Sequence, residues 1–267
     1  MDSQIMESEI IEVTSNNDSN FRILFHATNE MVTWRINTIR QKEPETIQWI
    51  DTFMPDDLFI DIGANIGLYS LYAAFSCGVT VIAFEPESLN YALLNKNIFI
   101  NKMDKKIKAY PIAISDGMTW SELHISEFKE GGSCHNFEDT CNFKHEPSLF
   151  SYTQGCLSMS LDELIQKKFI NIPQHIKIDV DGIEHKILKG AKQLLEHPEL
   201  KSILVEINNN LPIHREIIDQ MTAKGFVYSQ KQAEAHMCKE GVFKGVGNYI
   251  FFRPPNSEWE KYFSPAK

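Results

Sequence analysis

From residue 57 onward, short runs of apolar residues alternate with longer segments whose apolar residues recur at helical spacing. The runs predict strands at 58–62, 80–85, 107–114, 176–180, 203–207 and 248–253. The segments between them predict helices at 66–76, 89–100, 183–195 and 213–224. Strands that are apolar on both faces and alternate with helices indicate a parallel sheet covered on both sides. The pattern therefore predicts a doubly wound α/β domain.

Charge and composition narrow the functional classes. The 267 residues include 36 Asp and Glu against 26 Lys and Arg, a net charge of −10 that argues against general binding to a nucleic-acid backbone. We find no apolar run of the ~18 residues that a membrane span needs, and no secretory signal pattern at the N-terminus. Five scattered cysteines suit a reducing compartment. We expect a cytoplasmic protein with no nucleic-acid partner and no membrane span.

Two segments depart from the strand–helix rhythm. Residues 1–50 predict an extension of two or three antiparallel strands, with Phe25 and Trp34 in its core, and then a helix with Pro44 in its first turn. This extension is expected to shape a ligand pocket or to form a homodimer contact. The remaining domain, 51–267, contains a polar, irregular insertion at 117–156. The insertion either covers the site or is a flexible loop.

A glycine-rich turn follows the first strand of the domain, in the sequence DIGANIG. Gly63 and Gly67 allow a tight strand-to-helix turn, and the free N–H groups at a helix start favour an anion. The spacing is neither that of a P-loop nor that of a dinucleotide fingerprint. The turn alone is therefore a weak indication of ligand binding.

Two acidic residues make the prediction more specific. Asp61 ends the first strand, where a carboxylate can meet a cationic amine, and Glu85 ends the second, where it can hold ribose hydroxyls. An anion cradle, a cation acceptor and a ribose acceptor together describe S-adenosylmethionine. A nicotinamide cofactor leaves Asp61 without a cation to meet, so a nicotinamide-dependent oxidoreductase is the weaker alternative.

The segment IKIDVDG places charges within a buried strand. Lys177 and Asp179 point to the same face, which indicates either a structural ion pair or groups at a reacting centre, where Asp179 takes a proton or binds a metal. Glu206 and Asn208 end the next strand, so Asp179, Glu206 and Asn208 form a candidate Mg²⁺ site. The same side chains also suit capping a helix or lining a pocket.

Histidine and cysteine residues offer further candidates. His185 and His214 are alternative bases near these strand ends. Five cysteine and histidine residues of the insertion invite comparison with a zinc site: Cys134, His135, Cys141, His145 and Cys156. A zinc site is disfavoured because the paired C-x₂-C knuckle is missing. These residues are expected instead in a loop that covers the substrate.

Six segments together resemble the FkbM-type S-adenosylmethionine-dependent methyltransferases. They are FIDIGANIGLYSLYAA, VIAFEPES, PIAISD, SLDELI, IKIDVDGIEHKILKGA and ILVEIN, in that order over residues 57–208. The resemblance implies a class I methyltransferase fold, Rossmann-like, with a seven-stranded sheet whose last strand is antiparallel. It also implies methyl transfer to a hydroxyl, often on a sugar or a secondary metabolite.

The resemblance also assigns roles to residues. It implies that the methionine end of the cofactor lies against Asp61, Gly63, Ala64, Asn65 and Gly67. Glu85 would hold the ribose, and Ser115 and Asp116 would lie near the adenine, although Asp116 also suits a plain turn. The chain departs from the family pattern at Asp181, where a glutamate is usual, and Glu184 matches it.

The prediction is an S-adenosylmethionine-dependent O-methyltransferase whose catalytic residues are Asp179, Lys177 and Glu206, with or without Mg²⁺. Its acceptor is expected to be a sugar hydroxyl in a surface glycan or a glycosylated metabolite, consistent with polysaccharide biosynthesis. Three alternatives stay open: an N-methyltransferase, a nicotinamide-dependent oxidoreductase and a non-catalytic S-adenosylmethionine-binding module.

Overall fold

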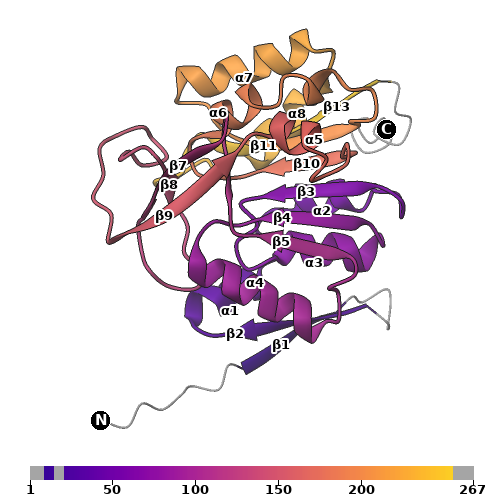
Figure 1. The fold of residues 1–267 in the computed structure, drawn as a ribbon, viewed down its shortest axis with the longest axis vertical. Coiled ribbons are helices and arrows are strands. Elements are labelled where there is room, and N and C mark those ends of the chain that lie inside the picture. The colour runs from indigo at the N-terminus through magenta and orange to yellow at the C-terminus, as the bar shows by residue number, and fades with distance from the viewer. Residues whose placement is uncertain (1–8, 15–20, 255–267) are drawn as a thin grey trace.

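A seven-stranded mixed sheet forms the centre of the computed structural model, which describes residues 9–14 and 21–254 (Figure 1). Its strand order is β12-β13-β11-β10-β3-β4-β5. Strand β13 is antiparallel to both neighbours, while β11, β10, β3, β4 and β5 pair in parallel. The bounds are β3 Leu58–Ile62, β4 Thr80–Phe84, β5 Ile107–Tyr110, β10 His175–Ile178, β11 Ser202–Asn208, β12 Val227–Tyr228 and β13 Val246–Phe252. The predicted seven-stranded sheet with an antiparallel last strand is confirmed.

Helices cover both faces of this sheet. Because side chains alternate along a strand, Phe59 of β3 joins one hydrophobic cluster while Ile60 and Ile62 join the other. The cluster around Phe59 contains α2 (Pro44–Ile50), α3 (Leu68–Ser76) and α4 (Ser88–Ile100). The opposite cluster contains α5 (Leu161–Gln166), α6 (Glu184–Lys189), α7 (Pro212–Ala223) and α8 (Gln230–His236). The doubly wound arrangement is therefore also confirmed.

The N-terminal residues differ from the prediction in one element. β1 (Glu9–Thr14) and β2 (Arg22–Ala27) pair antiparallel as expected, but a helix follows them, α1 (Glu30–Asn37). Asn29 caps this helix by accepting the N–H of Val32, and a helical turn buries Val32 and Ile36 together. Phe25 is buried as predicted, whereas Trp34 is 50% exposed on the outer face of α1, so its predicted place in the core is wrong.

The N-terminal elements share the hydrophobic cluster of α3 and α4. In Figure 1, β2 and α1 lie beyond α4, at the lower end of the molecule. The backbone N–H groups of Leu24 and His26 donate to the side chains of Asn101 and Asn97, which lie at the end of α4. These hydrogen bonds hold the N-terminal elements against the helix layer, which places α1 near the pocket described below.

The predicted insertion contains a small second sheet. β6 (Ala113–Ile114), β7 (Thr119–Ile125), β8 (Asn136–Phe137) and β9 (Tyr152–Met159) form four strands in the order β6-β9-β7-β8. The predicted strand at 107–114 is therefore wrong, because it divides at Pro111 into β5 and β6, which belong to different sheets. A proline has no N–H to donate to a ladder and favours such a break. The irregular character predicted for 117–156 is likewise corrected.

The predicted helix at 183–195 is shorter in the structure, and three short elements were not predicted. The predicted helix at 183–195 ends at Gly190 and is followed by a short 3₁₀ turn, η1 (Leu194–Glu196). A Cβ at Gly190 would overlap the carbonyl oxygen of Ser115, so close packing requires glycine where the helix ends. The short elements α5, α8 and β12 lie where no element was predicted.

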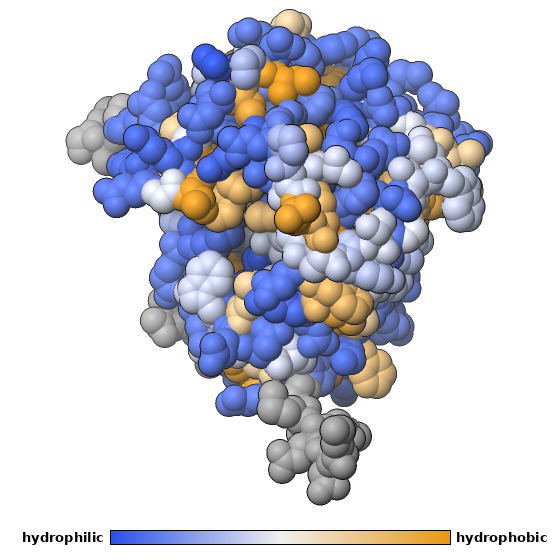
Figure 2. Space-filling view, turned by 90° about the vertical axis from the view of Figure 1, so that its left-hand side faces the viewer, coloured by the Kyte–Doolittle hydropathy of each residue, from blue (hydrophilic) through white to orange (hydrophobic). Residues whose placement is uncertain are grey.

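The surface is mostly hydrophilic on the face shown in Figure 2, where apolar side chains form small separate groups. None of the helices within residues 9–14 and 21–254 combines the length and apolar character needed to cross a membrane.

We expect Gly67→Ala to lower the free energy of unfolding by about 2 kcal/mol or more, because both backbone strain and overlap oppose a Cβ there. Gly67 has a φ of +88°, and an added Cβ would overlap a methyl of Leu94. Urea denaturation measures the change. Gly117→Ala, where nothing lies within 4 Å of the added atom, is the control and should shift stability by less than about 0.5 kcal/mol. Equal effects in the two variants would contradict the packing argument.

Candidate active site

A pocket of about 270 Å³ lies at the carboxyl ends of the central strands. Parallel strands direct their carboxyl ends to one edge, so residues that follow β3, β4, β10 and β11 meet there. The N-terminal helices, the insertion and β13 complete the wall. The charged and polar side chains that line the pocket include Arg35, Lys42, Glu43, Glu45, Asn65, Glu85, Asn90, Asp179, Asp181, Glu206, His236 and Asn248.

The glycine-rich turn forms one wall of the pocket. Gly63 and Asn65 line it, and both have positive φ, at +79° and +51°. The N–H groups of Gly63 and Ala64 donate to the carbonyl of Phe84, which fixes the turn to the end of β4. A Cβ at Gly63 would overlap the carbonyl oxygen of Asp179. Glycine is thus required at this position by the packing of the protein against itself, whatever ligand the turn holds.

Glu85 faces the same part of the pocket. Its two carboxyl oxygens accept the N–H groups of Asn65 at 2.7 Å and Glu87 at 2.9 Å. Burial outweighs these two hydrogen bonds and raises the pKa of Glu85 to about 8. The carboxyl group has acceptor capacity beyond these two hydrogen bonds, so it can also bind hydroxyl groups from the pocket.

Asp61 lies behind the pocket wall rather than on it. Its side chain is buried, accepts the hydroxyl of Ser70 at 2.6 Å, and is absent from the lining. Strand register places Lys177 of β10 directly beside it. Burial raises the pKa of Asp61, and the charge of Lys177 opposes that rise. The cation next to Asp61 is therefore a side chain of the protein.

Four other predicted cofactor residues also lie off the pocket surface. Ala64 is buried, and Gly67 is the residue at which α3 begins. Ser115 is buried, while Asp116 is exposed and pairs with Lys189 at 2.6 Å. Instead, the apolar residues 112–114, which come after β5, line the pocket wall.

A strap from the insertion crosses the glycine-rich turn. The side-chain amides of Asn65 and Asn90 both donate to the carbonyl of Gly132, at 2.7 and 3.1 Å. The Nε of Arg35 donates to the carbonyl of Gly131 at 2.8 Å, and so ties the strap to α1. The insertion was expected either to cover the site or to be a flexible loop, and this strap corresponds to a cover.

Lys177 and Asp179 form an ion pair, which is one of the two alternatives that the strand pattern left open. Their atoms Nζ and Oδ2 are 2.6 Å apart, and their side chains are 2% and 25% exposed. Burial acts to lower the pKa of Lys177, but the charges of Asp179 and Asp61 outweigh it and raise that pKa. Burial acts to raise the pKa of Asp179, and Lys177 followed by Lys42 outweighs it, so that pKa is lowered. Asp179 is therefore held as a carboxylate.

The pKa values of Glu206 and Asp181 shift in the opposite direction to that of Asp179. Burial, followed by the charges of Asp179 and Asp181, raises the pKa of Glu206 well above its usual value. Burial, followed by Asp179, raises that of Asp181, which accepts the N–H of Cys134 at 2.7 Å. Within the described ranges Glu206 has no hydrogen-bond or ion-pair partner. The pocket thus holds a fixed anion beside two carboxyl groups that ionise at higher pH.

The predicted Mg²⁺ ligands are not brought together. Asn208 is not part of the pocket wall: its amide oxygen accepts from the backbone and side chain of Asn210, and its amide nitrogen donates to the carbonyl of Phe143. Asp179, Asp181 and Glu206 do not converge as a cluster of three ligand atoms among the described residues. The residues present do not fit a bound Mg²⁺, and no step of the reaction is assigned to one.

The sequence prediction allowed the N-terminal extension to shape a ligand pocket, but it named none of the residues through which the extension lines this pocket. Lys42, Glu43 and Glu45 reach the pocket from the segment that leads into α2. Glu45 accepts the side-chain amide of Asn248 at 3.0 Å and lies 3.1 Å from His236, which links α2 to β13 and α8. No motif marks these residues, because they meet the strand ends only through tertiary packing.

Comparison with known proteins agrees with this architecture. Residues 61–228 match the family model described as the methyltransferase FkbM domain. A hexuronic acid methyltransferase, AglP of Haloferax volcanii, is 26% identical over 181 residues, which cover 66% of this chain and 66% of that protein, slightly less than two thirds of its length.

Two further similarities were found. The 31-O-demethyl-FK506 methyltransferase FkbM of Streptomyces tacrolimicus is 24% identical over 67% of this chain and 75% of that protein. The solved methyltransferase domain of METTL16 has a TM-score of 0.50 at 12% identity, covering 92% of this chain and 87% of that one, and so shows the fold alone.

We expect Lys177→Met to lower the free energy of unfolding by about 3–5 kcal/mol, because it leaves Asp61 and Asp179 without their shared cation. Chemical denaturation measures the loss. Lys189→Met removes the exposed pair with Asp116 and is the control, with an expected change of less than about 1 kcal/mol. A similar small change in both variants would show that the buried pair does not anchor the sheet.

Proposed function

The chain belongs to the FkbM methyltransferase family, and on this premise we propose that it transfers the methyl group of S-adenosylmethionine to a sugar hydroxyl. The observation that carries the proposal is the contrast between two acids in the pocket. Asp179 is held as a carboxylate, whereas Glu206 has a raised pKa and no ion-pair partner among the described residues. Such a pair suits the binding and deprotonation of a hydroxyl.

The residues around the glycine-rich turn fit the proposed cofactor. Glu85 has acceptor positions left for the ribose hydroxyls, and it lines the pocket. Apolar side chains of Phe84, Ile112 and Leu123 form a surface suited to the adenine ring. When bound, the cofactor supplies an activated methyl group on a sulfonium.

The other half of the pocket suits a polar acceptor. Arg35 and Lys42 are cationic, while Glu43 and Glu45 are acidic. Asn248 is held by Glu45 and lies at the pocket wall. Charged and amide side chains of this kind bind sugar hydroxyls through multiple hydrogen bonds. The AglP relative is named for a hexuronic acid, which supports a sugar as the acceptor class.

Deprotonation of the acceptor hydroxyl is assigned to Glu206. A general base works best when its pKa lies near the working pH, and burial moves the pKa of Glu206 upward. The low pKa of Asp179 makes it a weak base but a strong hydrogen-bond acceptor. Asp179 therefore orients the hydroxyl, Lys177 holds Asp179 in place, and Glu206 takes the proton as the methyl group is transferred in line.

We expect Glu206→Gln to lower kcat by about 100-fold or more, because an amide cannot accept the proton. In the wild type, kcat/KM should rise with pH through a range above the usual titration of a glutamate, since the raised pKa of Glu206 keeps it protonated at lower pH. Steady-state rates across a pH series test both statements. A wild-type profile without this rise, or full activity of Glu206→Gln, would contradict the assignment.

We expect Glu85→Gln to weaken binding of S-adenosylhomocysteine by about 10-fold, because the amide replaces one acceptor oxygen of a carboxylate with a donor. Isothermal titration calorimetry measures the affinity. Asp116→Asn is the matched control and should bind as the wild type does, since its side chain pairs with Lys189 outside the pocket wall. Loss of affinity in Asp116→Asn alone would place the nucleoside elsewhere.

The acceptor can be identified with a panel of nucleotide sugars, uronic acids and glycans incubated with the enzyme and S-adenosylmethionine. Mass spectrometry should detect the gain of one methyl group in place of hydrogen, and release of S-adenosylhomocysteine should match it. Thermal stabilisation by NAD and not by S-adenosylhomocysteine would instead favour the oxidoreductase alternative.

A further inference from the structure

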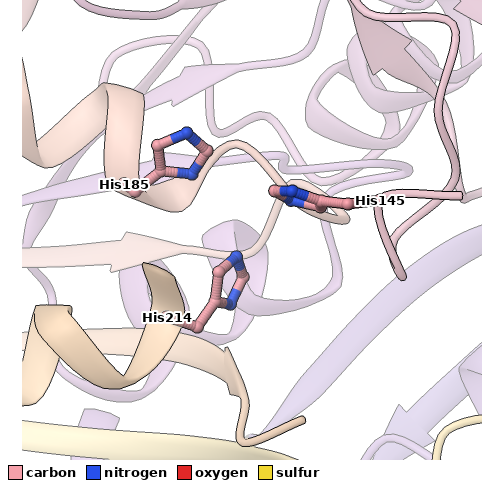
Figure 3. Close-up of side chains that lie close together, drawn as sticks. All are labelled: His145, His185 and His214. Carbon is pink, nitrogen blue, oxygen red and sulfur yellow. The ribbon is translucent and has the colours of Figure 1, made fainter. Parts of the chain in front are cut away.

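Three histidines from separate parts of the chain face one another beside the pocket. His145 lies in the insertion between β8 and β9, His185 lies in α6 and His214 lies in α7 (Figure 3). One ring nitrogen from each lies within 4.8 Å of the other two. None of the three lines the pocket, so they form a separate cluster, here called the histidine triad.

The triad is buried on one side and open on the other. His214 is buried, His185 is half-buried and His145 is exposed. The ring centroids lie 5.8–6.2 Å apart with interplanar angles of 49°, 83° and 49°, so no two rings stack face to face. The open side gives a metal ion and a water ligand a route to the ring nitrogens.

Hydrogen bonding leaves one triad nitrogen without a partner. Nδ1 of His185 is buried and has no hydrogen bond within the described ranges. An unpaired buried polar atom is unfavourable, and natural structures rarely keep one without a ligand or a water. Nε2 of His145 lies 3.0 Å from the carbonyl oxygen of Gly182, and Nε2 of His214 lies 3.3 Å from the same oxygen, so one carbonyl holds these two rings near each other.

The triad rings are chemically suited to a metal. Each offers a ring nitrogen toward the other two, and neutral imidazole is the form of histidine that binds metals.

We propose that His145, His185 and His214 bind one divalent transition-metal ion, with Zn²⁺ as the best match. Three imidazole nitrogens with a fourth position open to water are a known arrangement for Zn²⁺, whereas Mg²⁺ prefers oxygen ligands. Tetrahedral binding at about 2.0–2.1 Å places ligand nitrogens roughly 3.4 Å apart, so the rings close by about 1 Å on the ion.

His214 binds the ion as its other neutral tautomer. The N–H of Asn208 donates to Nδ1 at 3.1 Å, so the proton of the metal-free ring is on Nε2. When Nε2 bonds to the ion, this proton moves to Nδ1, the ring stays neutral, and the hydrogen bond from Asn208 is replaced by the metal–nitrogen bond.

The metal ties the insertion to the wall of the pocket. Phe143 lies two residues before His145, its carbonyl accepts the amide of Asn208, and its ring stacks on that of Phe243 at 4.7 Å. Phe243 lines the pocket. Because His185 and His214 belong to helices that follow β10 and β11, the ion fixes this segment against the strand ends that carry Asp179 and Glu206. Its role is to position the wall, and it takes no part in methyl transfer.

The proposal is tested by calorimetric titration of ZnCl₂ into the full chain, produced without a histidine tag and treated with EDTA before dialysis. We expect one Zn²⁺ per chain and visible absorption bands when Co²⁺ replaces it. His185→Ala should weaken binding by roughly 100-fold or more, since it removes a ligand. His197→Ala, outside the triad, is the control and should bind as the wild type does. Unchanged affinity in His185→Ala, or no saturable binding by the wild type, would overturn the proposal.

One further variant keeps the test independent of folding and of enzymatic activity. His145→Ala alters an exposed ring and should leave the circular dichroism spectrum unchanged while it abolishes the rise in melting temperature caused by Zn²⁺. An equal rise in that variant would contradict the assignment of His145 as a ligand.

Discussion

The buried ammonium of Lys177, shared by Asp61 and Asp179, is the interaction on which the rest of the site depends. It lies where β3 and β10 pair, and the two carboxyl groups beside it raise its pKa, because an ammonium buried at the centre of the sheet is strongly unfavourable without a counter-charge. Gly63 packs against the carbonyl of Asp179 at the same place. One ion pair thus aligns the end of β10 with the glycine-rich turn, and the catalytic and cofactor halves of the pocket are positioned together.

The pocket is completed by segments that are distant in sequence. The strap at Gly131 and Gly132 hydrogen-bonds to Asn65 and Asn90 from one side and to Arg35 from the other, so α1, the insertion and the glycine-rich turn hold one another. This linkage explains why the N-terminal elements pack within the same hydrophobic cluster as α3 and α4. In the proposed reaction, the strap would exclude water from the methyl group and the N-terminal helices would select the acceptor.

Local sequence pattern predicted most regular elements of the sheet and its helices. The strand at 58–62 has the observed bounds, and α3, α4 and α7 begin within two residues of their predicted starts. The errors fall where another constraint overrides strand propensity. Asn29 caps a helix where alternation suggested a strand, and Pro111 divides one predicted strand between two sheets. The polar insertion forms strands because β9 pairs with β6 on one side and with β7 on the other, in a second sheet.

The sequence by itself determined the fold class, the glycine-rich turn and the acids at the carboxyl ends of β4, β10 and β11, because alternation and strand ends are local properties of the chain. Tertiary structure decided which of those acids face the pocket. Asp61 faces Lys177, Asp116 faces Lys189, and Glu206 has no partner among the described residues. It also gathered the histidine triad from three segments. Such outcomes depend on burial and on contacts between distant residues, which set both the charge state and the direction of a side chain, and no local pattern records them.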